Sequence, residues 1–321
     1  MHRVNNNSYD IYYELMKAYR SLPVVPPEEG EELDYVYKGV RMYTICERAS
    51  LDALPTWEVR PDDVFVMTYP KSGTTWMQHI VLEVMKLTGR VSVNKEVHLS
   101  FRFPNLESTW IHHISQAGLV KPGNVVLDEA PSPRLIKTHL PSCMLPEQML
   151  TKAPRIIYVS RNPKDVAVSY YHWHRSAYFL PGYDSWDVFF EEFIRGAVIN
   201  GCVFDHNLFW WKRRHQANVL FVKYEDMQRD LRSTIARVAS FIGESLTEAQ
   251  VDQVYESSTF SSMKTNPKAN LDDSYGNMKA FMRTGKSGGW KSTFTVAQNE
   301  RFDEICREKL RGTGLTFDFG L

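Results

Sequence analysis

The chain contains four apolar runs, and three of them are followed by apolar residues at helical spacing. They are Val64 to Tyr69, then residues 134–140, 155–161 and 219–227. After the first run, apolar residues recur at helical spacing, at Met77, Ile80, Val81, Val84 and Met85. Strands that are apolar throughout and alternate with helices are typical of a parallel sheet covered on both faces. The pattern therefore predicts an α/β fold with a central parallel sheet flanked by helices.

Further helices are expected along the second half of the chain. Two follow the third and fourth apolar runs, over residues 162–173 and 229–243, and two begin with capping boxes that pair Thr247 with Gln250 and Thr295 with Gln298. Two segments depart from this pattern. Residues 1–35 end in a Pro- and Glu-rich stretch that indicates an extended arm. Residues 260–290 show no clear period, and so long a connection is either a functional lid, which we favour, or a floppy insertion.

Composition narrows the function classes. The chain has 321 residues with 38 Lys and Arg against 38 Asp and Glu, so its formal net charge is zero. This excludes nucleic-acid binding through a general basic field, and any polyanionic ligand must be held by a local cluster. The cysteines, Cys46, Cys143, Cys202 and Cys306, lack CxxC spacing, which argues against a zinc site or a disulfide framework and fits a reducing compartment. The sequence shows neither a signal-peptide pattern nor a membrane-spanning stretch, so we expect a cytoplasmic protein. No His, Cys and Asp grouping has metal-ligand spacing, so we expect no metal.

The strongest chemical signal is YPKSGTTW, residues 69–76, between the first strand and the first helix. Backbone N–H groups at a helix N-terminus lack intrahelical partners, and the helix dipole there favours an anion. Gly73 allows close approach of the backbone, Lys71 supplies a positive charge, and Thr74 and Thr75 add hydroxyl donors. The segment predicts a phosphate or sulfate site, not a plain tight turn. It differs from a Walker A loop because Lys71 precedes the glycine.

Two more groups stand at predicted strand ends. Arg161 closes the third run, and Ser169 follows about two helical turns later, so the pair forms a candidate second anion clamp. Lys137, Thr138 and His139 close the second run, where a His can take a proton and a Lys can meet negative charge. Taken alone, Arg161 fits a surface residue equally well, and a lone His is more often structural. Their shared place at the ligand-binding edge of a parallel sheet favours the functional interpretation.

The chain contains, in this order, the segments YPKSGTTW, IKTHLP, YVSRNPKDVAVSYYHW, VKYEDM, FMRTG followed by GWK, and KSTFTVAQNERFD. They resemble the signature segments of the cytosolic sulfotransferase family and cover the chain from about residue 35 onward. The resemblance implies transfer of a sulfuryl group from 3′-phosphoadenosine 5′-phosphosulfate (PAPS) to a hydroxyl or amine, with release of 3′,5′-diphosphoadenosine (PAP). It implies one sulfotransferase domain over residues 36–321, similar to nucleotide kinases, after an arm of residues 1–35.

The resemblance also assigns roles to single residues. The 5′-phosphosulfate is expected at Lys71, Ser72, Gly73, Thr74 and Thr75, and the adenine at Trp76, Tyr224, Ser258, Thr259, Phe260 and Met263. The 3′-phosphate is expected at Arg161 and Ser169, under a lid that includes Phe281, Met282, Arg283 and Gly285. His139 matches the catalytic base, Lys71 and Lys137 match the groups that stabilise charge, and the acceptor is expected beside Lys137, Thr138 and His139. Lys291, Thr295, Val296 and Glu300 match a homodimer segment.

Three positions depart from the family pattern. Thr284 stands where Lys is usual, with Lys286 two places further on, so a donor to the 3′-phosphate is expected to be lost or replaced. Gly289 replaces a common Asp, which is expected to loosen the loop. Asn105 replaces an aromatic gate, which indicates a wider or more polar acceptor site. The alternatives are a PAPS- or PAP-binding protein with little catalysis, and a family member whose sulfated product eliminates to give net dehydration. A P-loop kinase is disfavoured by the inverted Lys and Gly order.

Aromatic residues gather in the segments that are expected to line the acceptor pocket. They are Tyr37, Tyr43, Phe101, Phe103, Trp110, Tyr170, Tyr171, Trp173, Tyr178 and Phe179. Such a lining fits a small apolar acceptor such as a phenol, a sterol or another alcohol. Core packing accounts for part of the same set. The physiological acceptor does not follow from these residues.

Overall fold

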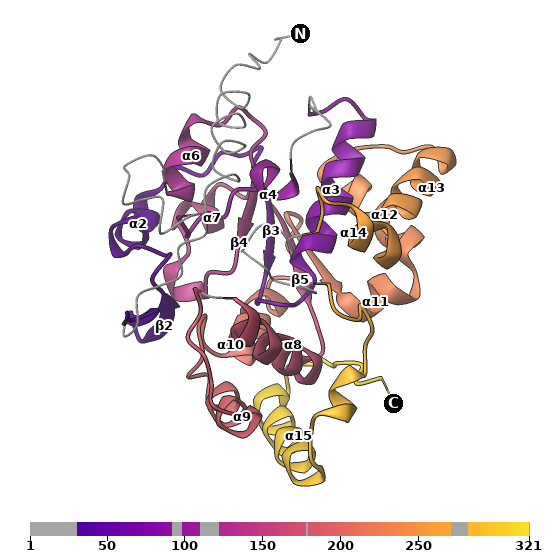
Figure 1. Ribbon diagram of the computed structural model, residues 1–321. Helices are drawn as coiled ribbons and strands as arrows, with labels where there is room; N and C mark the ends of the chain where they lie inside the picture. Colours follow the sequence, from indigo (N-terminus) through magenta and orange to yellow (C-terminus); the bar gives the residue numbers. More distant parts are fainter. Residues whose placement is uncertain (1–30, 92–97, 110–121, 178, 271–281, 321) are drawn as a thin grey trace.

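A parallel sheet of four strands forms the centre of the molecule, as the apolar runs predicted (Figure 1). The computed structural model describes residues 31–91, 98–109, 122–177, 179–270 and 282–320. The strands are β3 (Val64–Thr68), β4 (Leu135–Thr138), β5 (Arg155–Ser160) and β6 (Val219–Lys223), and they lie in the order β4-β3-β5-β6. Val64 pairs in parallel with both Leu135 and Arg155, and Ile156 pairs with Val219. A separate antiparallel pair joins β1 (Asp34–Tyr37) to β2 (Val40–Tyr43).

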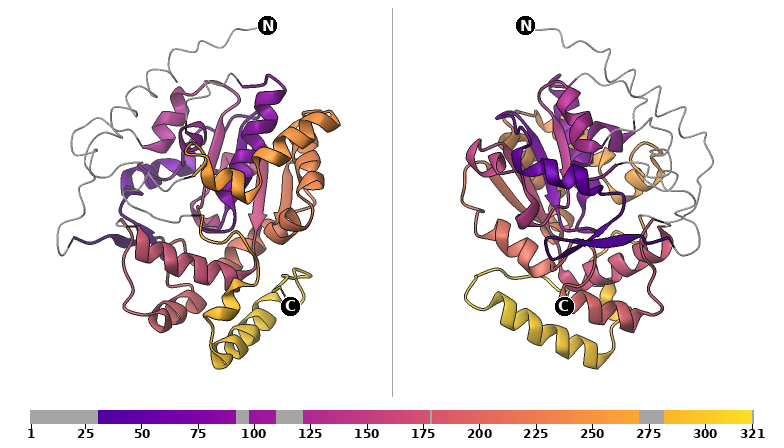
Figure 2. Two further views of the ribbon diagram at one scale, coloured as in Figure 1. Left: turned by 45° about the vertical axis from the view of Figure 1, so that its right-hand side comes forward. Right: turned by 90° about the vertical axis from the view of Figure 1, so that its left-hand side faces the viewer.

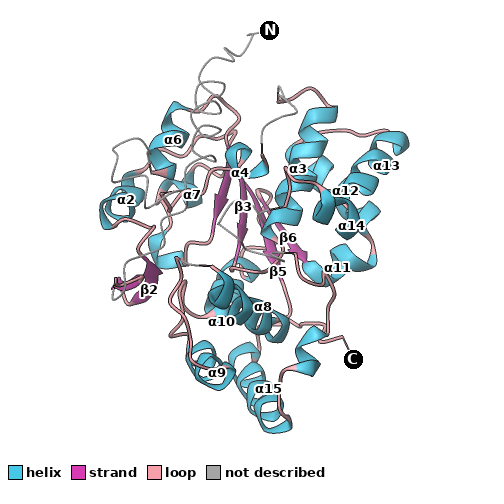
Figure 3. Cartoon of the chain, in the orientation of Figure 1, coloured by secondary structure: helices cyan, strands magenta, loops and turns pink. Residues whose placement is uncertain are grey.

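Helices connect the strands and cover them (Figure 3). The α-helices are α2 (Arg48–Ala53), α3 (Thr74–Leu87), α4 (Leu99–Arg102), α6 (Gly123–Glu129), α7 (Gln148–Thr151), α8 (Pro163–Ser176), α9 (Trp186–Arg195), α10 (Val203–Trp211), α11 (Tyr224–Arg229), α12 (Leu231–Ile242), α13 (Glu248–Ser257), α14 (Phe260–Thr265) and α15 (Val296–Leu310). Short 3₁₀ turns are η1 (Leu54–Thr56), η2 (Ser142–Met144) and η3 (Gly289–Ser292). Among the described residues, no helix is both long enough and apolar enough to cross a membrane.

The sheet separates two hydrophobic cores because successive strand residues point to opposite faces. Every residue of β3 is buried. Val64 and Val66 pack in the core that contains α3, α12 and α13, whereas Phe65 and Met67 pack in the core that contains α8, α9, α10 and α15. In Figure 2 the purple α3 and the orange helices that follow β6 lie together on one side of the sheet. The predicted covering of both faces is confirmed.

Several predicted element ends are confirmed by their capping contacts. Asn162 caps α8 by accepting a hydrogen bond from the Lys164 N–H, and Pro163 occupies the first turn. Both capping boxes are present, at the starts of α13 and α15. Helix α3 gives way at Thr88 to Gly89, which has φ +70°. These are local contacts between neighbouring residues, which is why the sequence alone predicts them.

Three boundaries differ from the sequence prediction. The run 219–227 was expected to be one strand, but β6 ends at Lys223 and α11 begins at Tyr224, with acidic Glu225 and Asp226 in its first turn. The predicted loop 260–290 begins instead with helix α14, which Thr259 caps through the Ser262 N–H, and residues 271–281 lie outside the described residues. Strand β1 crosses the boundary predicted at residue 35.

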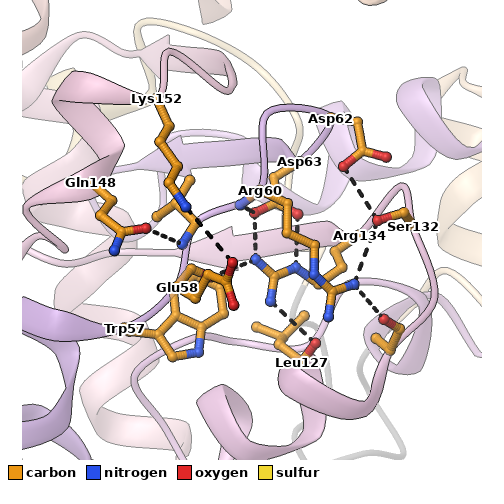
Figure 4. A network of polar contacts seen from close by, with 12 residues as sticks. Trp57, Glu58, Arg60, Asp62, Asp63, Leu127, Ser132, Arg134, Gln148 and Lys152 are labelled. Atoms are coloured by element: carbon orange, nitrogen blue, oxygen red, sulfur yellow. Dashed lines mark hydrogen bonds and ion pairs between the residues drawn. The ribbon is translucent and has the colours of Figure 1, made fainter.

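A buried ion pair holds the edge of the sheet at which the strands begin (Figure 4). The Arg134 side chain is 1% exposed and its Nη2 lies 2.6 Å from Oδ2 of Asp63, which is 0% exposed. The same guanidinium donates to the carbonyl oxygens of Glu58 and Leu127 and lies 4.3 Å from the ring centroid of Trp57. Asp63 and Arg134 directly precede β3 and β4, so the pair fixes the starts of two neighbouring strands.

Candidate active site

The loop between β3 and α3 is shaped to hold an anion. Lys71 has φ +68° and Gly73 has φ +103°, both in the left-handed region. A Cβ on Gly73 would lie 2.7 Å from a ring carbon of Tyr224, so only glycine allows this approach. Gly73 is also the N-cap residue of α3 and no side chain caps the helix there. The first N–H groups of α3 are therefore available to a ligand.

A cavity of about 160 Å³ lies beside this loop, at the edge of the sheet where the strands end. It is lined by Pro70, Lys71, Gly73, Thr74, Thr75, Trp76, Lys137, His139, Arg161, Ser169, Trp173, Tyr224, Phe260, Met263, Met282, Arg283, Thr284 and Gly285. These residues come from the ends of all four parallel strands and from helices α3, α8, α11 and α14. The fold thus brings together the anion loop, the candidate base and the lid segment.

Positive charge is concentrated in this cavity. Burial, with the charges of Arg161, Lys137 and Arg283, lowers the pKa of Lys71 to about 7. Arg161 donates to the Lys71 carbonyl oxygen at 3.1 Å and lies 4.3 Å from the ring centroid of Tyr224. Its Nε is buried and has no hydrogen-bond partner among the described residues. These cations and this unused donor fit a ligand that carries several phosphate or sulfate groups.

His139 lies one residue beyond β4 and is 5% exposed. Its Nδ1 is 2.9 Å from the carbonyl oxygen of Thr68, so Nδ1 donates the hydrogen and Nε2 is left as the basic nitrogen. The Thr68 hydroxyl lies 3.2 Å from the same Nδ1 and 2.7 Å from Oγ1 of Thr74, which links His139 to the anion loop. Burial, together with the charge of Lys137, holds the pKa of His139 well below its usual value. The imidazole is thus neutral at neutral pH, and its Nε2 carries a free lone pair that can accept a proton.

Sequence reasoning assigned no role to Glu107, which the fold places directly behind His139. Glu107 is 0% exposed, and its Oε1 accepts a hydrogen bond of 2.8 Å from the His139 backbone N–H. Burial raises the pKa of Glu107, and its negative charge partly offsets the burial that lowers the pKa of Lys137. Glu107 precedes His139 by 32 residues in a connecting segment, so no local pattern signals the contact.

Most of the residues predicted to bind the cofactor line the cavity, and a few contact the lining residues without reaching the cavity. Ser258 is fully buried and its carbonyl oxygen accepts a hydrogen bond of 2.8 Å from Trp76 Nε1, while Thr259 caps α14. Thr138 is buried within β4, where its hydroxyl accepts a hydrogen bond from the Leu140 N–H. Ser72, Thr138, Ser258 and Thr259 therefore do not line the cavity. Phe281 lies outside the described residues.

The expected acceptor lining contributes one residue, Trp173, to this cavity. Tyr43, Tyr170 and Phe179 instead belong to the core that includes α8, and Phe103 to the core that includes α3. Tyr37, Phe101 and Tyr171 do not line the cavity either, and Trp110 and Tyr178 lie outside the described residues. Asn105, the replaced gate, is 4% exposed and bridges to Lys137 through its backbone.

Two departures from the family pattern have clear positions. Thr284 lines the cavity, next to Arg283, so it remains available to a ligand there. Gly289 lies between Gly288 and Trp290, whose N–H groups both donate to the Asp165 carboxylate. A Cβ on Gly289 would meet only Asp165 Oδ1, at 3.8 Å, so the position has room for a side chain.

Comparison with known proteins places this geometry in a family. The model of the sulfotransferase domain family matches residues 61–314. Sulfotransferase 1A1 of Canis lupus familiaris is 41% identical over 298 residues, which cover 91% of this chain and 98% of that protein. Sulfotransferase 1C2 of Homo sapiens is 38% identical over 285 residues, which cover 85% of this chain and 93% of that protein.

Solved structures agree with this assignment. Mouse sulfotransferase SULT7A1 complexed with PAP is 31% identical, with a TM-score of 0.72, and the match covers 88% of this chain and 95% of that one. Retinol dehydratase in complex with androsterone and inactive cofactor PAP is 28% identical, with a TM-score of 0.77, and the match covers 98% and 97%. The family model, the sequence relatives and the solved structures agree with the cation-lined cavity: the chain belongs to the sulfotransferase family and is a PAPS-dependent sulfotransferase.

Proposed function

We propose that this enzyme transfers the sulfuryl group by in-line displacement to a hydroxyl of a small, mostly apolar acceptor. The acceptor oxygen forms a bond to sulfur while its proton passes to Nε2 of His139. The bond from sulfur to the 5′-phosphate oxygen breaks, and PAP leaves with the electron pair. The observation that carries this proposal is the hydrogen bond from His139 Nδ1 to Thr68, which leaves Nε2 basic inside a cavity lined by cations.

Two lysines act on the charge that moves during transfer. Lys71 belongs to the anion loop, so its ammonium group meets the negative charge that grows on the departing phosphate oxygen. Lys137 lines the same cavity two residues before His139, and its ammonium group stabilises negative charge during the transfer. Arg161 and Ser169 hold the 3′-phosphate, and Arg283 closes over it from the lid segment. Fixed positive groups of this kind need no rearrangement at the moment of reaction.

The acceptor class rests on the apolar wall and on the relatives. Trp173, from the expected acceptor lining, lines the cavity, while the apolar side chains of Phe260 and Met263 in the same cavity are assigned to the adenine. Solved structures of a similar fold hold androsterone in one case and retinol in another. We therefore place phenols, sterols and other ring-bearing alcohols first. With an allylic alcohol, loss of the new sulfate group gives net dehydration, and the similarity to retinol dehydratase supports this as the second candidate.

The first experiment is release of PAP from PAPS in the presence of a panel of phenols, sterols, amines and retinoid alcohols. Mass spectrometry of the acceptor then separates a sulfate ester from a product that has lost water. We expect acceptor-dependent release with phenols or sterols and a sulfate ester as the product. Tight PAP binding without turnover of any acceptor would overturn the proposed transfer, while a dehydrated product alone would replace it by the second candidate.

Replacement of His139 by Ala tests the base. The single-turnover rate of transfer is expected to fall by about 10²- to 10⁴-fold, the usual contribution of a general base. The Kd of PAP is expected to stay within about threefold, because His139 faces the reacting oxygen and not the phosphates. His215→Ala is the matched control, since that exposed histidine lies away from the cavity. Wild-type transfer by His139→Ala would exclude this residue as the base.

We further propose that the enzyme forms a homodimer through the segment that contains Lys291, Thr295, Val296 and Glu300. Val296 is 76% exposed at the start of α15, although it is apolar. Thr295, Lys291 and Glu300 are also exposed, so the segment presents one apolar side chain among polar ones. A short segment of this kind supports a small interface of low stability.

A further inference from the structure

The carboxylate of Asp165 holds a turn that lies just beyond the lid segment. Asp165 is 4% exposed and belongs to the first turn of α8. Its Oδ2 accepts a hydrogen bond of 2.8 Å from the Gly288 N–H, and its Oδ1 accepts one of 3.0 Å from the Trp290 N–H. Asn162 Nδ2 donates to the same Oδ2 at 3.3 Å. Both oxygens of a buried carboxylate are thus used on backbone and amide donors.

This turn is connected to the cavity by a few residues. Residues 282–285 line the cavity, and the following residue, Lys286, accepts a hydrogen bond of 3.4 Å from Arg161 Nη2 through its carbonyl oxygen. Gln228 of α11 donates to the carbonyl oxygen of Gly285. The backbone therefore runs from the lid segment, residues 282–285, past Arg161 and is then hydrogen-bonded to Asp165. Asp165 lies in the first turn of α8, four residues after Arg161 in the sequence.

The far side of the same turn is held by a buried lysine. Lys164 is 2% exposed, and its Nζ lies 4.4 Å from the ring centroid of Trp290 and 4.8 Å from that of Phe319. Trp290 Nε1 donates to the Phe319 carbonyl oxygen at 2.9 Å, and Lys164 Nζ donates to Asn299 Oδ1 at 2.6 Å. Trp290 thus donates its backbone N–H to Asp165 and contacts Lys164 through its ring.

We propose that Asp165 is a positioning residue for the cofactor, which fixes the Gly288–Trp290 turn and thereby holds Arg283 over the 3′-phosphate. The proposal rests on the assignment of the 3′-phosphate to Arg161 and Arg283. Asp165 does not line the cavity, and it acts through the backbone N–H groups of Gly288 and Trp290. A carboxylate suits this role because it offers two acceptors and no donor, whereas an asparagine would turn an N–H₂ group toward one of the two backbone N–H groups.

The test compares PAP with adenosine 5′-monophosphate, which lacks the 3′-phosphate, in the full-length wild type and in Asp165→Asn. Loss of one charge-assisted hydrogen bond predicts that the Kd of PAP rises about tenfold to hundredfold. The Kd of adenosine 5′-monophosphate should stay within about twofold of wild type, because the 5′-phosphate loop is untouched. Asp62→Asn is the matched control, since Asp62 lies at the opposite edge of the sheet near Ser132 and should change neither constant.

Asp165→Glu, which keeps the charge and both acceptor oxygens, should recover most of the PAP affinity. Hydrogen exchange of the peptide that spans residues 285–291 gives a second readout: exchange should be faster in Asp165→Asn and, in the wild type, slower with PAP than with adenosine 5′-monophosphate. An equal loss of affinity for both nucleotides, or unchanged exchange, would overturn the proposal. If Asp165→Asn does not fold, the wild-type exchange comparison decides alone. Failure of the wild type to bind PAP would instead refute the cofactor assignment.

Discussion

At the scale of single residues, the site works by taking charged groups out of water. Lys71 lies near the charges of Arg161, Lys137 and Arg283, and its pKa of about 7 leaves it partly neutral at physiological pH. Glu107 is buried, accepts a hydrogen bond from the His139 backbone N–H, and raises the pKa of Lys137 by its negative charge. The cavity thus brings like charges together, and an anionic ligand offsets their repulsion.

PAP binding should depend on pH through Lys71. A bound phosphate raises the pKa of Lys71 above its value of about 7 in the free enzyme, so the bound state holds the proton more tightly. Affinity should thus be highest below pH 7 and fall by up to about tenfold per pH unit as the pH rises above 7, until the raised pKa is reached. Calorimetry between pH 7 and 9, in buffers of different ionisation enthalpy, should detect proton uptake. Lys71→Met should bind PAP more weakly and lose this uptake; an unchanged pH slope in that variant would contradict the assignment.

Glu107→Gln should slow transfer without loosening the nucleotide. The amide keeps one acceptor for the His139 N–H but removes the charge that partners Lys137. We expect the single-turnover rate to fall about tenfold, equivalent to about 1.4 kcal/mol of transition-state stabilisation. The Kd of PAP should remain at the wild-type value. Glu58→Gln, at a side chain that is 74% exposed, is the control. A matching rise in Kd would mean that Glu107 supports the whole cavity and not the reacting centre.

The residues proposed to react are marked more clearly in the sequence than the residues that hold them. Arg161 and His139 directly follow strands, and Lys71 and Gly73 lie in the loop between β3 and α3, so a local pattern of strand, loop and helix reveals them. Glu107 reaches His139 across 32 residues, and Asp165 reaches Gly288 across 123. Contacts of that range are set by the packing of the fold, and nothing in the neighbouring sequence marks them.

At the scale of elements, the starts of β3 and β4 depend on one buried ion pair. Arg134→Met should lower the free energy of unfolding by about 3–5 kcal/mol, because it leaves the Asp63 carboxylate buried without its partner. Urea denaturation measures this loss. Arg60→Met is the control: Arg60 donates to the carbonyl oxygens of Ala130 and Asp128 nearby but is partly exposed, so its loss should be clearly smaller. Equal losses of unfolding free energy in the two variants would show that the buried ion pair contributes no more to stability than the partly exposed Arg60.

Element prediction succeeded where one kind of signal dominated. The apolar runs gave the four strands of the parallel sheet, and the caps at Asn162, Thr247 and Thr295 gave helix starts. It was wrong for residues 224–227 and 260–265, which form α11 and α14. Both are six-residue helices, too short to show a hydrophobic period, and the first continues directly from an apolar strand.

At the scale of the whole molecule, the proposed dimer segment lies next to the turn that Asp165 holds. Val296→Glu should convert the enzyme to a monomer, because it places a charge at the exposed apolar side chain of the proposed interface. Sedimentation velocity over a range of concentrations measures this shift. Val188→Glu on α9, at a side chain of the same type that is 47% exposed, is the control and should leave the oligomeric state unchanged. A monomeric wild type, or a dimeric Val296→Glu, would refute the interface.

The pairing of the sheet has a consequence for how the enzyme is made. Val64 pairs with Leu135 and Arg155, and Ile156 with Val219, so each ladder of the four-stranded parallel sheet joins residues more than 60 positions apart. Sheets of such long-range pairing assemble slowly, and in a chain of this size through intermediates. The cavity needs residues from Pro70 to Gly285, so a growing chain on the ribosome cannot capture the nucleotide. Nucleotide supply should therefore govern how long finished molecules survive, and leave the rate of their synthesis and folding unchanged.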